Sequence, residues 1–279
     1  MPPQDQRAAL VKGWNQAAEG WARQQLAFDR AAAPVASRIV ELARLEPGER
    51  VLELASGLGD TGLVAAAKVG PSGSVVLSDA APKMLDRLRD RVKGSDHIEV
   101  KELFAEGLKF DTACVDAVLC RWGYMLLLDP VSALQETRRV LAPGGRVSLA
   151  AWTSHEDNPW TGATLPALGD RGLTGDPTRP GPQMFAWADP SLIVTALEDA
   201  GFFDITVEQV DMTFEYASFD DWWDARLDLS PDFAARIGEI SPEERDELTE
   251  DLEREVRPWL EADGSLRFPG RTHVAAADV

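Results

Sequence analysis

The sequence predicts an α/β protein with a doubly wound, mostly parallel sheet of seven strands. Two observations support this fold class. Between Arg50 and Trp152, short apolar runs typical of buried strands alternate with segments of helical spacing. The first of these strands continues into three glycines, Gly57, Gly59 and Gly62, and then into a helix-forming stretch. A strand, a glycine turn and a helix in this order bring backbone N–H groups and a helix N-terminus close to a ligand.

The rest of the chain is expected to surround this core. Residues 1–45 should form an N-terminal helical lid, which Pro34 would break into two helices. Residues 46–152 are the expected Rossmann-like core, and residues 153–279 complete the same domain with helical cap insertions after the fifth and sixth strands. Strands are expected at 51–54, 74–78, 98–103, 115–119, 146–152, 202–210 and 266–276, the last at an edge of the sheet.

Composition limits the partners. Lys plus Arg number 28 against 47 Asp plus Glu, a formal net charge of −19, which repels nucleic acid and anionic membrane surfaces. A small-molecule partner is therefore expected, with the protein a monomer or a homodimer. The two cysteines, Cys114 and Cys120, argue against a disulfide scaffold. Because the sequence has no apolar signal core and no run of about 18 apolar residues, a soluble cytoplasmic protein is expected.

Glu53 distinguishes between the possible ligands. It lies four residues before Gly57, where a dinucleotide-binding strand requires an apolar side chain in the sheet. An acid there indicates a ligand end with a positive or donor-rich group, which favours S-adenosylmethionine over NAD. An NAD-dependent oxidoreductase is the second hypothesis, although the sequence lacks an obvious Tyr-x-x-x-Lys pair. A non-catalytic ligand-binding protein on the same fold is the third.

Four motifs in the same order as in a known family strengthen the first hypothesis. They are V-L-E-L-A-S-G-L-G at 51–59, S-D-A-A-P-K-M-L at 78–85, V-D-A-V-L at 115–119 and L-Q-E-T-R-R-V-L-A-P-G-G-R at 134–146. Together they resemble class I S-adenosylmethionine-dependent methyltransferases, in particular the quinone-biosynthesis C-methyltransferases and small-molecule methyltransferases. The resemblance implies the Rossmann-like methyltransferase fold and S-adenosyl-L-methionine as cofactor. It also implies transfer of a methyl group to a small organic acceptor, an O-, C- or N-nucleophile, by in-line displacement, with no metal.

The resemblance also assigns cofactor-binding residues. Glu53 would receive the cofactor's ammonium, and Asp79, which lies 22 residues after Gly57, would bind the ribose hydroxyls. Alternatively, Glu53 caps N–H groups of the following loop and Asp79 caps the helix that starts near Ala81. The amino-acid tail would lie along the backbone of Ala55, Ser56, Gly57 and Gly59. Ala80 and Met84 would pack on the adenine, or belong to the core.

One segment departs from the family pattern. Where the family usually has an acid followed by alanine after the third strand, this chain has Phe104, Ala105 and Glu106. The adenine amino group would then be met by Glu106 or by backbone, and Phe104 could stack on the base. A buried phenylalanine without ligand contact is the alternative.

The acceptor side has weaker signals. Arg121, Trp122 and Tyr124 follow the fourth strand and should line the methyl-transfer cleft, with Arg121 near the cofactor. His155 follows the fifth strand and is the candidate general base, although a loop histidine is more often solvated. Four further residues are assigned to the acceptor side: Trp14, Trp21, Asn158 and Trp160. Trp14 and Trp21 would close over the cofactor, or reflect simple helix packing.

Overall fold

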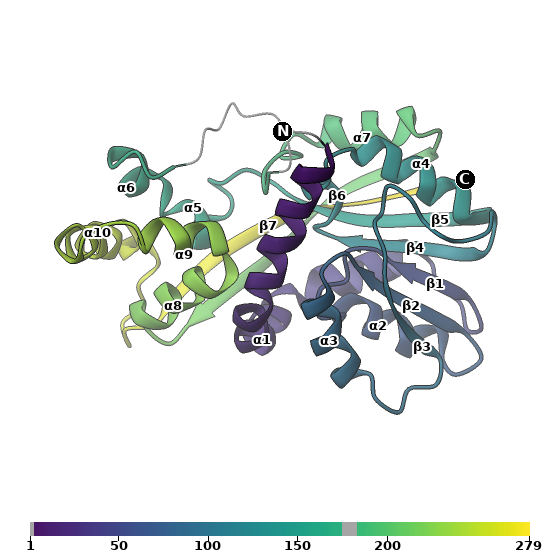
Figure 1. Ribbon diagram of the computed structural model, residues 1–279, viewed down its shortest axis with the longest axis horizontal. Helices are drawn as coiled ribbons and strands as arrows, with labels where there is room; N and C mark the ends of the chain where they lie inside the picture. Colours follow the sequence, from purple (N-terminus) through teal and green to yellow (C-terminus); the bar gives the residue numbers. More distant parts are fainter. Residues whose placement is uncertain (1–2, 175–182) are drawn as a thin grey trace.

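The protein is organised around one sheet. The computed structural model describes residues 3–174 and 183–279, apart from the side chains of residues 3, 231 and 232. In these residues seven strands follow the order β3-β2-β1-β4-β5-β7-β6 (Figure 1). β7 is antiparallel to both neighbours, and the pairs among the first five strands are parallel. The strands are β1 Arg50–Glu53, β2 Ser74–Asp79, β3 Ile98–Glu102, β4 Val115–Arg121, β5 Leu141–Trp152, β6 Phe203–Tyr216 and β7 Leu266–Asp278.

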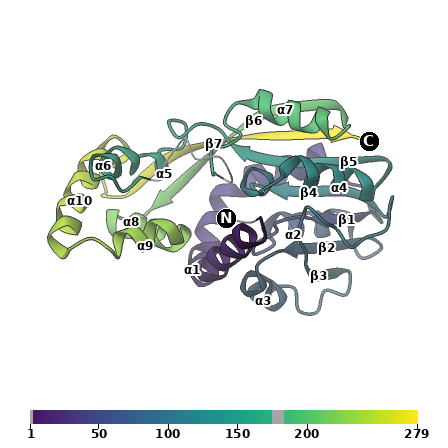
Figure 2. The ribbon, with the colours of Figure 1, turned by 45° about the horizontal axis from the view of Figure 1, so that its top comes forward.

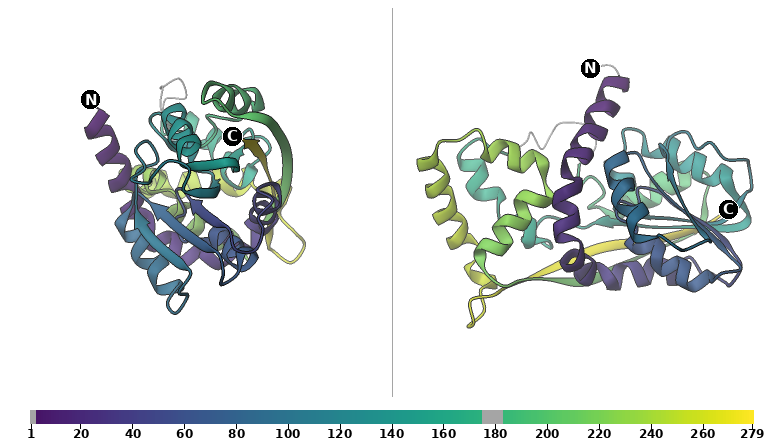
Figure 3. Two further views of the ribbon diagram at one scale, coloured as in Figure 1. Left: turned by 90° about the vertical axis from the view of Figure 1, so that its right-hand side faces the viewer. Right: turned by 60° about the horizontal axis from the view of Figure 1, so that its bottom comes forward.

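Helices cover both faces of the sheet. The core helices are α1 Pro3–Leu42, α2 Asp60–Val69, α3 Pro82–Arg91, α4 Pro130–Val140 and α7 Pro190–Asp199. α1, α2 and α3 pack together on one face, and α4 packs with α7 on the other (Figure 3). The predicted fold class, a doubly wound and mostly parallel seven-stranded sheet, is confirmed.

A helical cap lies at one end of the molecule. β6 and β7 extend beyond the other strands and carry the cap away from the core (Figures 1 and 2). Its elements are α5 Pro159–Gly162, α6 Leu165–Asp170, α8 Phe219–Leu229, α9 Pro231–Ile237, α10 Pro242–Glu255 and the short 3₁₀ helix η2 Arg257–Trp259. The cap thus comes from the segments after β5 and β6, where insertions were expected. The expected irregular segment after β5 includes residues 175–182, which lie outside the described part of the chain.

Local sequence explains where several helices begin. α4, α7 and α10 each have proline in the first turn, where its missing N–H costs no hydrogen bond. Asp129 and Asp189 precede α4 and α7, and each carboxylate accepts a first-turn N–H. Ser241 and Glu244 form a reciprocal capping box at α10.

Two expectations were wrong. Pro34 does not split the N-terminal segment, because α1 continues through it. One lost hydrogen bond is offset by packing: Ala32, Val35 and Ile39 are fully buried around the proline. The last strand, expected at an edge, instead lies between β5 and β6, and Val274–Ala277 are fully buried, as is typical of a central strand. The edge strand on this side of the sheet is β6.

α1 joins the core to the cap. It bends along its length, so that its first part stands between the cap and α3 and its second part runs along the sheet (Figure 3). Asn15 Oδ1 accepts the Lys83 N–H of α3 at 2.9 Å, whereas Gln24 Nε2 donates to Asp228 of α8 at 2.8 Å. Among the described residues, no helix is both long and apolar enough to cross a membrane.

The contact between α1 and α8 makes a first prediction. A Cβ at Gly20 would overlap the backbone carbonyl of Asp228, whereas a Cβ at Gly13 would meet nothing within 4 Å. Gly20→Ala should therefore lower the free energy of unfolding by about 1–3 kcal/mol, because the helices must separate. Gly13→Ala should raise it by about 0.5–1 kcal/mol through helix propensity. Urea denaturation of both variants checks this; equal effects would show that the two helices do not dock closely.

Candidate active site

The candidate site lies where the sheet changes direction. The chain runs from β1 outward to β2 and β3, then returns to β4 on the other side of β1. Open α/β sheets bind ligands outside the carboxyl ends of the strands at such a switch point. Three charged residues stand at these ends: Glu53 on β1, Asp79 on β2 and Arg121 on β4.

Glu53 is buried at the end of β1, with 2% of its surface exposed. Its Oε2 accepts the Gly62 N–H at 2.9 Å, and a Cβ at Gly62 would overlap that oxygen. The alternative role of Glu53, capping the N–H groups of the following loop, therefore holds for its Oε2. Its Oε1 makes no hydrogen bond to the described residues. Burial raises the pKa of Glu53 to about 8, although the nearby charge of Arg121 acts in the opposite direction.

The glycine turn has three residues with left-handed backbone. These are Ala55 (φ 50°), Gly57 (φ 53°) and Gly59 (φ 82°). A Cβ at Gly57 would meet no protein atom within 4 Å, whereas a Cβ at Gly59 would overlap Leu88 of α3. Packing of the turn therefore accounts for Gly59, whereas Gly57 is favoured by its positive φ and has an open side toward which a ligand could approach.

Strained backbone occurs at two neighbouring strand ends. Ala55 after β1 and Trp122 (φ 59°) after β4 are non-glycine residues in the left-handed region. Such strain collects at functional sites, where the surrounding structure holds it in place. Gly123 permits the arrangement, because a Cβ there would lie 2.7 Å from that of Ala55.

Asp79 is held by backbone. Its Oδ2 accepts the Gly57 N–H and its Oδ1 accepts the Ala81 N–H, each at 2.9 Å. Burial raises the pKa of Asp79, while these backbone N–H groups oppose the rise. Asp79 therefore braces both the glycine turn and the start of α3. Since each carboxylate oxygen has a further lone pair, two acceptor positions remain for a ligand.

A buried polar network fixes Arg121. Asp60, the first residue of α2, accepts hydrogen bonds from Gln25 (3.0 Å), Arg91 (2.6 Å) and Arg121 Nη2 (3.2 Å). Asp29 lies one turn beyond Gln25 on α1. Burial raises the pKa of Asp29, and the nearby negative charge of Asp60 raises it further. The guanidinium of Arg121 is thereby oriented, with its carbon 5.0 Å above the Trp122 ring.

Three buried polar atoms around this network have no partner in the described part of the chain. They are Ser56 Oγ, Thr61 Oγ1 and Arg121 Nη1. Buried polar groups are normally hydrogen-bonded, so such a cluster fits a polar ligand. A buried carboxylate and a guanidinium with a spare donor suit the ammonium and carboxylate of an amino-acid tail. Among the described residues, no group of His, Cys, Asp and Glu could hold a metal ion.

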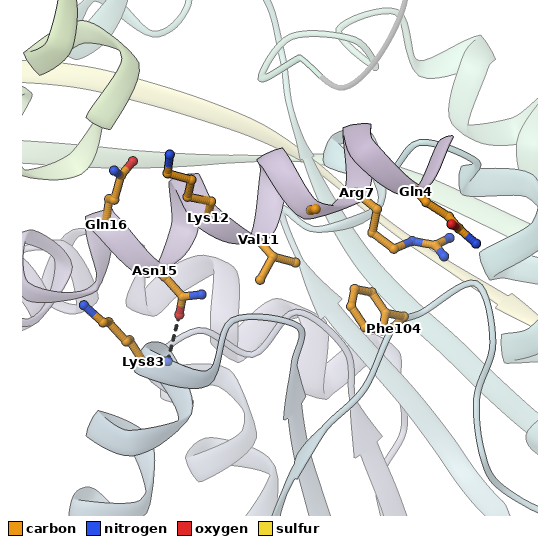
Figure 4. Close-up of a pocket in the computed structure, with 9 residues that line it drawn as sticks. Gln4, Arg7, Val11, Lys12, Asn15, Gln16, Lys83 and Phe104 are labelled. Atoms are coloured by element: carbon orange, nitrogen blue, oxygen red, sulfur yellow. Dashed lines mark hydrogen bonds between the residues drawn. The ribbon is translucent and has the colours of Figure 1, made fainter. Parts of the chain in front are cut away.

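A pocket of about 580 Å³ lies on the other side of the strand ends, between α1, the start of α3 and Phe104 (Figure 4). Phe104 is 36% exposed, so the alternative of a buried phenylalanine is wrong. The Arg7 guanidinium carbon lies 5.3 Å above its ring and Arg7 Nη2 is 3.6 Å from Glu106 Oε1. Glu106 is thus engaged by α1 rather than directed only at a ligand. Ala105 is buried beside it.

The tryptophans of α1 lie against the cofactor-side residues. Ala17 and Ala18 form a buried cluster with Leu58, Ala81 and Met84, and Trp14 and Trp21 pack on this cluster. Their rings are 6.1 Å apart. Met84 is therefore a core residue in this structure, while Ala80 next to it is half-buried. The structure thus brings Trp14 and Trp21 to the glycine turn, where Leu58 lies.

An aromatic wall continues from the end of β4 into the cap. Trp122 stacks on Trp152 at 4.1 Å between ring centroids, and Trp152 lies 5.4 Å from Trp160. Phe28 of α1 contacts Trp122 and Trp160, and Phe214 stacks on Trp160 at 4.4 Å. The predicted residues Trp122 and Trp160 thus share one apolar surface.

Two residues assigned to the acceptor have structural contacts instead. Tyr124 is 1% exposed, and its hydroxyl shares a 2.6 Å hydrogen bond with Thr137 Oγ1 of α4. The Asn158 amide is fully buried: Nδ2 donates to Thr153 Oγ1, the Ser154 carbonyl and the Arg271 carbonyl, and Oδ1 accepts the Arg271 N–H. The hydrogen bonds of the Asn158 amide are thus made to β7 and to its own loop. The assignment of Tyr124 and Asn158 to the acceptor is therefore corrected.

His155 lies in the predicted loop but points toward solvent. Its side chain is 48% exposed, and Nε2 is 3.1 Å from Glu156 Oε1. Its ring centroid is 6.2 Å from that of Phe185. None of the strand-end charges contacts it among the described residues. The solvated-loop alternative therefore describes its surroundings better than the role of general base.

Sequence reasoning missed the residues that orient Arg121. Asp60 directly follows Gly59, so its place in the first turn of α2 could have been found. Gln25 and Asp29 are four residues apart, a spacing that puts them on one helix face. Arg91 carried no signal, because its contact with Asp60 depends on how α3 packs.

Comparison with known proteins identifies the fold and the domain. The sheet order with antiparallel β7 defines the class I methyltransferase fold, and residues 51–145 match the family model described as a methyltransferase domain. The chain is 35% identical to a demethylmenaquinone methyltransferase of Clavibacter sepedonicus over 47% of each protein. It is also 35% identical to a ubiquinone/menaquinone biosynthesis C-methyltransferase of Xylella fastidiosa, over 41% of this chain and 47% of that protein. The chain thus spans about half the length of these relatives.

A solved structure agrees in fold. The YcgJ protein of Bacillus subtilis aligns with a TM-score of 0.57 at 18% identity, covering 87% of this chain and 97% of that one. Residues 51–145 therefore match a methyltransferase domain, and the sheet has the fold of the class I S-adenosylmethionine-dependent methyltransferases. The chain is distantly related to the ubiquinone and menaquinone C-methyltransferases. S-adenosylmethionine is the cofactor of the family, and the NAD alternative is not supported.

The raised pKa of Glu53 predicts a pH-dependent stability. The unfolded state loses this proton above its usual pKa of 4.5, whereas the folded, cofactor-free protein keeps it to about pH 8. The contribution of protonated Glu53 to the free energy of unfolding is fully present below pH 4.5 and is lost as the pH rises to 8. Glu53→Gln, which cannot ionise, should be more stable than the parent by an amount growing to about 3–5 kcal/mol at pH 8. Denaturation of both at pH 5 and pH 8 checks this; a constant difference would contradict the assigned pKa.

Proposed function

We propose that the protein transfers a methyl group from S-adenosylmethionine to a small organic acceptor. One observation carries the proposal: at the switch point, the buried Glu53 carboxylate lies near Arg121, whose side chain is 10% exposed and whose buried Nη1 donor has no partner in the described residues. This pair is complementary to the ammonium and carboxylate of the cofactor's amino-acid tail. The family of the 51–145 domain supports the same cofactor.

The remaining residues complete the proposed cradle. Asp79 offers its two remaining acceptor positions to the ribose hydroxyls, and the open side of Gly57 lets the backbone approach the tail. Ala80, which follows Asp79, and Ala105, which follows the pocket residue Phe104, would border the adenine end. Trp14 and Trp21 on α1 close this region from solvent.

The bound cofactor supplies a methyl group on sulfonium, which is already strongly electrophilic. The chain's own residues then have to orient the acceptor and exclude water. Trp122, fixed by stacking on Trp152 and by its Nε1 donating to Thr272 Oγ1 at 2.9 Å, forms a rigid wall beside Arg121. Rigid aromatic walls favour a flat acceptor. The net charge of −19 disfavours nucleic acid as that acceptor.

Cofactor binding is tested by calorimetry with S-adenosylmethionine and with NAD. The protein should bind the former and not the latter. Asp79→Ala should weaken S-adenosylmethionine by roughly 1.5–3 kcal/mol, about 10- to 150-fold. Asp116→Ala is the matched control, because Asp116 stands at the opposite end of β4, where its carboxylate binds Arg50. Equal losses in both variants would make the effect of Asp79 merely structural.

Catalysis is tested with His155→Ala on a panel of phenols, quinols and amines, read by the mass gain of the product. Because His155 is half-exposed and paired with Glu156, turnover should stay within a factor of about three of the parent. A general base contributes about 10²–10⁴-fold, so a loss of that size with unchanged cofactor affinity would restore His155 as the base.

A further inference from the structure

Arg226 of α8 is a buried cation without a matching acid among the described side chains. It is 7% exposed, and its guanidinium carbon lies 5.6 Å above the Trp160 ring and 5.5 Å from the Phe233 ring centroid. Its Nε has no hydrogen-bond partner in the described residues, and within them no carboxylate forms an ion pair with it. An unpaired buried charge is unfavourable for folding. The chain is rich in acids, yet none of the described ones compensates this charge.

The surroundings of Arg226 agree with an uncompensated charge. Burial lowers its pKa to about 10, and the nearby ionisable group that opposes this is Tyr216, which is also buried. An arginine retained at such a position has a cost for the free protein. A negatively charged ligand would remove that cost by pairing with the guanidinium.

A second unused donor lies on Trp160, whose ring the Arg226 guanidinium contacts. Trp160 Nε1 is buried and has no partner in the described part of the chain. Two other tryptophans are satisfied: Trp122 donates to Thr272 Oγ1, and Trp222 donates to the Trp160 carbonyl, each at 2.9 Å. Trp21 Nε1 on α1 also lacks a partner among the described residues, but it is not in the Arg226 contact. Arginine and tryptophan side chains offer donors only. Two orphaned donors without an acceptor therefore indicate an anionic ligand group.

Arg226 is connected to the candidate active site. The ring of Trp160 belongs to the aromatic wall that leads through Trp152 to Trp122, next to Arg121. Phe28 touches both Trp122 and Trp160. These contacts link Arg226 to the strand ends of β1 and β4.

We propose that the methyl acceptor is an aromatic carboxylic acid and that its carboxylate is received by Arg226 and Trp160 Nε1. This inference rests on the proposed methyl transfer. It adds the substrate class, and it makes Arg226 the residue that selects an acid over its neutral analogue.

The test compares acids with their primary amides. The full chain, saturated with S-adenosylhomocysteine, is titrated with benzoate, 1-naphthoate, 2-naphthoate and indole-3-carboxylate, and with the corresponding amides, by calorimetry. We expect at least one acid to bind ten times or more tightly than its amide. Arg226→Met should reduce that ratio to about twofold or less while keeping the affinity for S-adenosylhomocysteine. Arg245→Met, which removes one exposed positive charge from α10, should leave the ratio unchanged.

The outcomes separate the two proposals. If no acid in the panel is preferred, or if the preference survives Arg226→Met, the assignment of Arg226 is overturned. If S-adenosylhomocysteine does not bind the parent protein, the proposed function fails, and the acid-versus-amide comparison is then made on the protein alone.

Stability gives a readout independent of any ligand. Arg226→Met removes an uncompensated charge and keeps an apolar contact with the aromatic rings, so it should raise the Tm of the ligand-free protein by roughly 2–4 °C. A fall of several degrees would mean that Arg226 has a structural partner, and would contradict its role as an acceptor-binding cation.

Discussion

The hydrogen bond from the Gly62 N–H to the buried Glu53 carboxylate is the interaction on which the site depends. It requires glycine at 62, because any Cβ would overlap the carboxylate. It ties the end of β1 to the first turn of α2 and so fixes the glycine turn between them. It also leaves Oε1 of Glu53 without a partner among the described residues, in surroundings where burial opposes ionisation of the carboxyl group. A cationic ligand would make the ionised form favourable. The same contact therefore serves the fold and the candidate site.

The other charged groups are organised around this contact. Asp79 braces the turn from β2, and Asp60 orients Arg121 through contacts with α1 and α3. α1 closes one side of the site with Trp14 and Trp21 and reaches the cap through Gln24 and Asp228. Because one helix touches both the glycine turn and α8, binding of the cofactor and of the acceptor would act on the same element. The aromatic wall between them has little exposed surface in this structure.

The sequence was informative where the site is local and poor where it is not. Glu53, Gly57 and Asp79 were found because their roles follow from their spacing around one strand and turn. The continuity of α1 through Pro34 was missed, since packing of neighbouring side chains outweighs one lost hydrogen bond. The central position of β7 depends on pairing with β5 and β6, far away in the sequence. Asn158 and Tyr124 were misassigned for a similar reason: their polar atoms bind Arg271 and Thr137.

The central claim is that Glu53 ionises to receive the ammonium of S-adenosylmethionine. Its most direct test counts the protons released on binding, by calorimetry at pH 7 in buffers of different ionisation enthalpy. With a pKa of about 8 in the free protein, Glu53 is mostly protonated at pH 7, so the parent should release close to one proton per cofactor bound. Glu53→Gln should bind more weakly and release essentially none. Equal proton release by the two proteins would contradict the account.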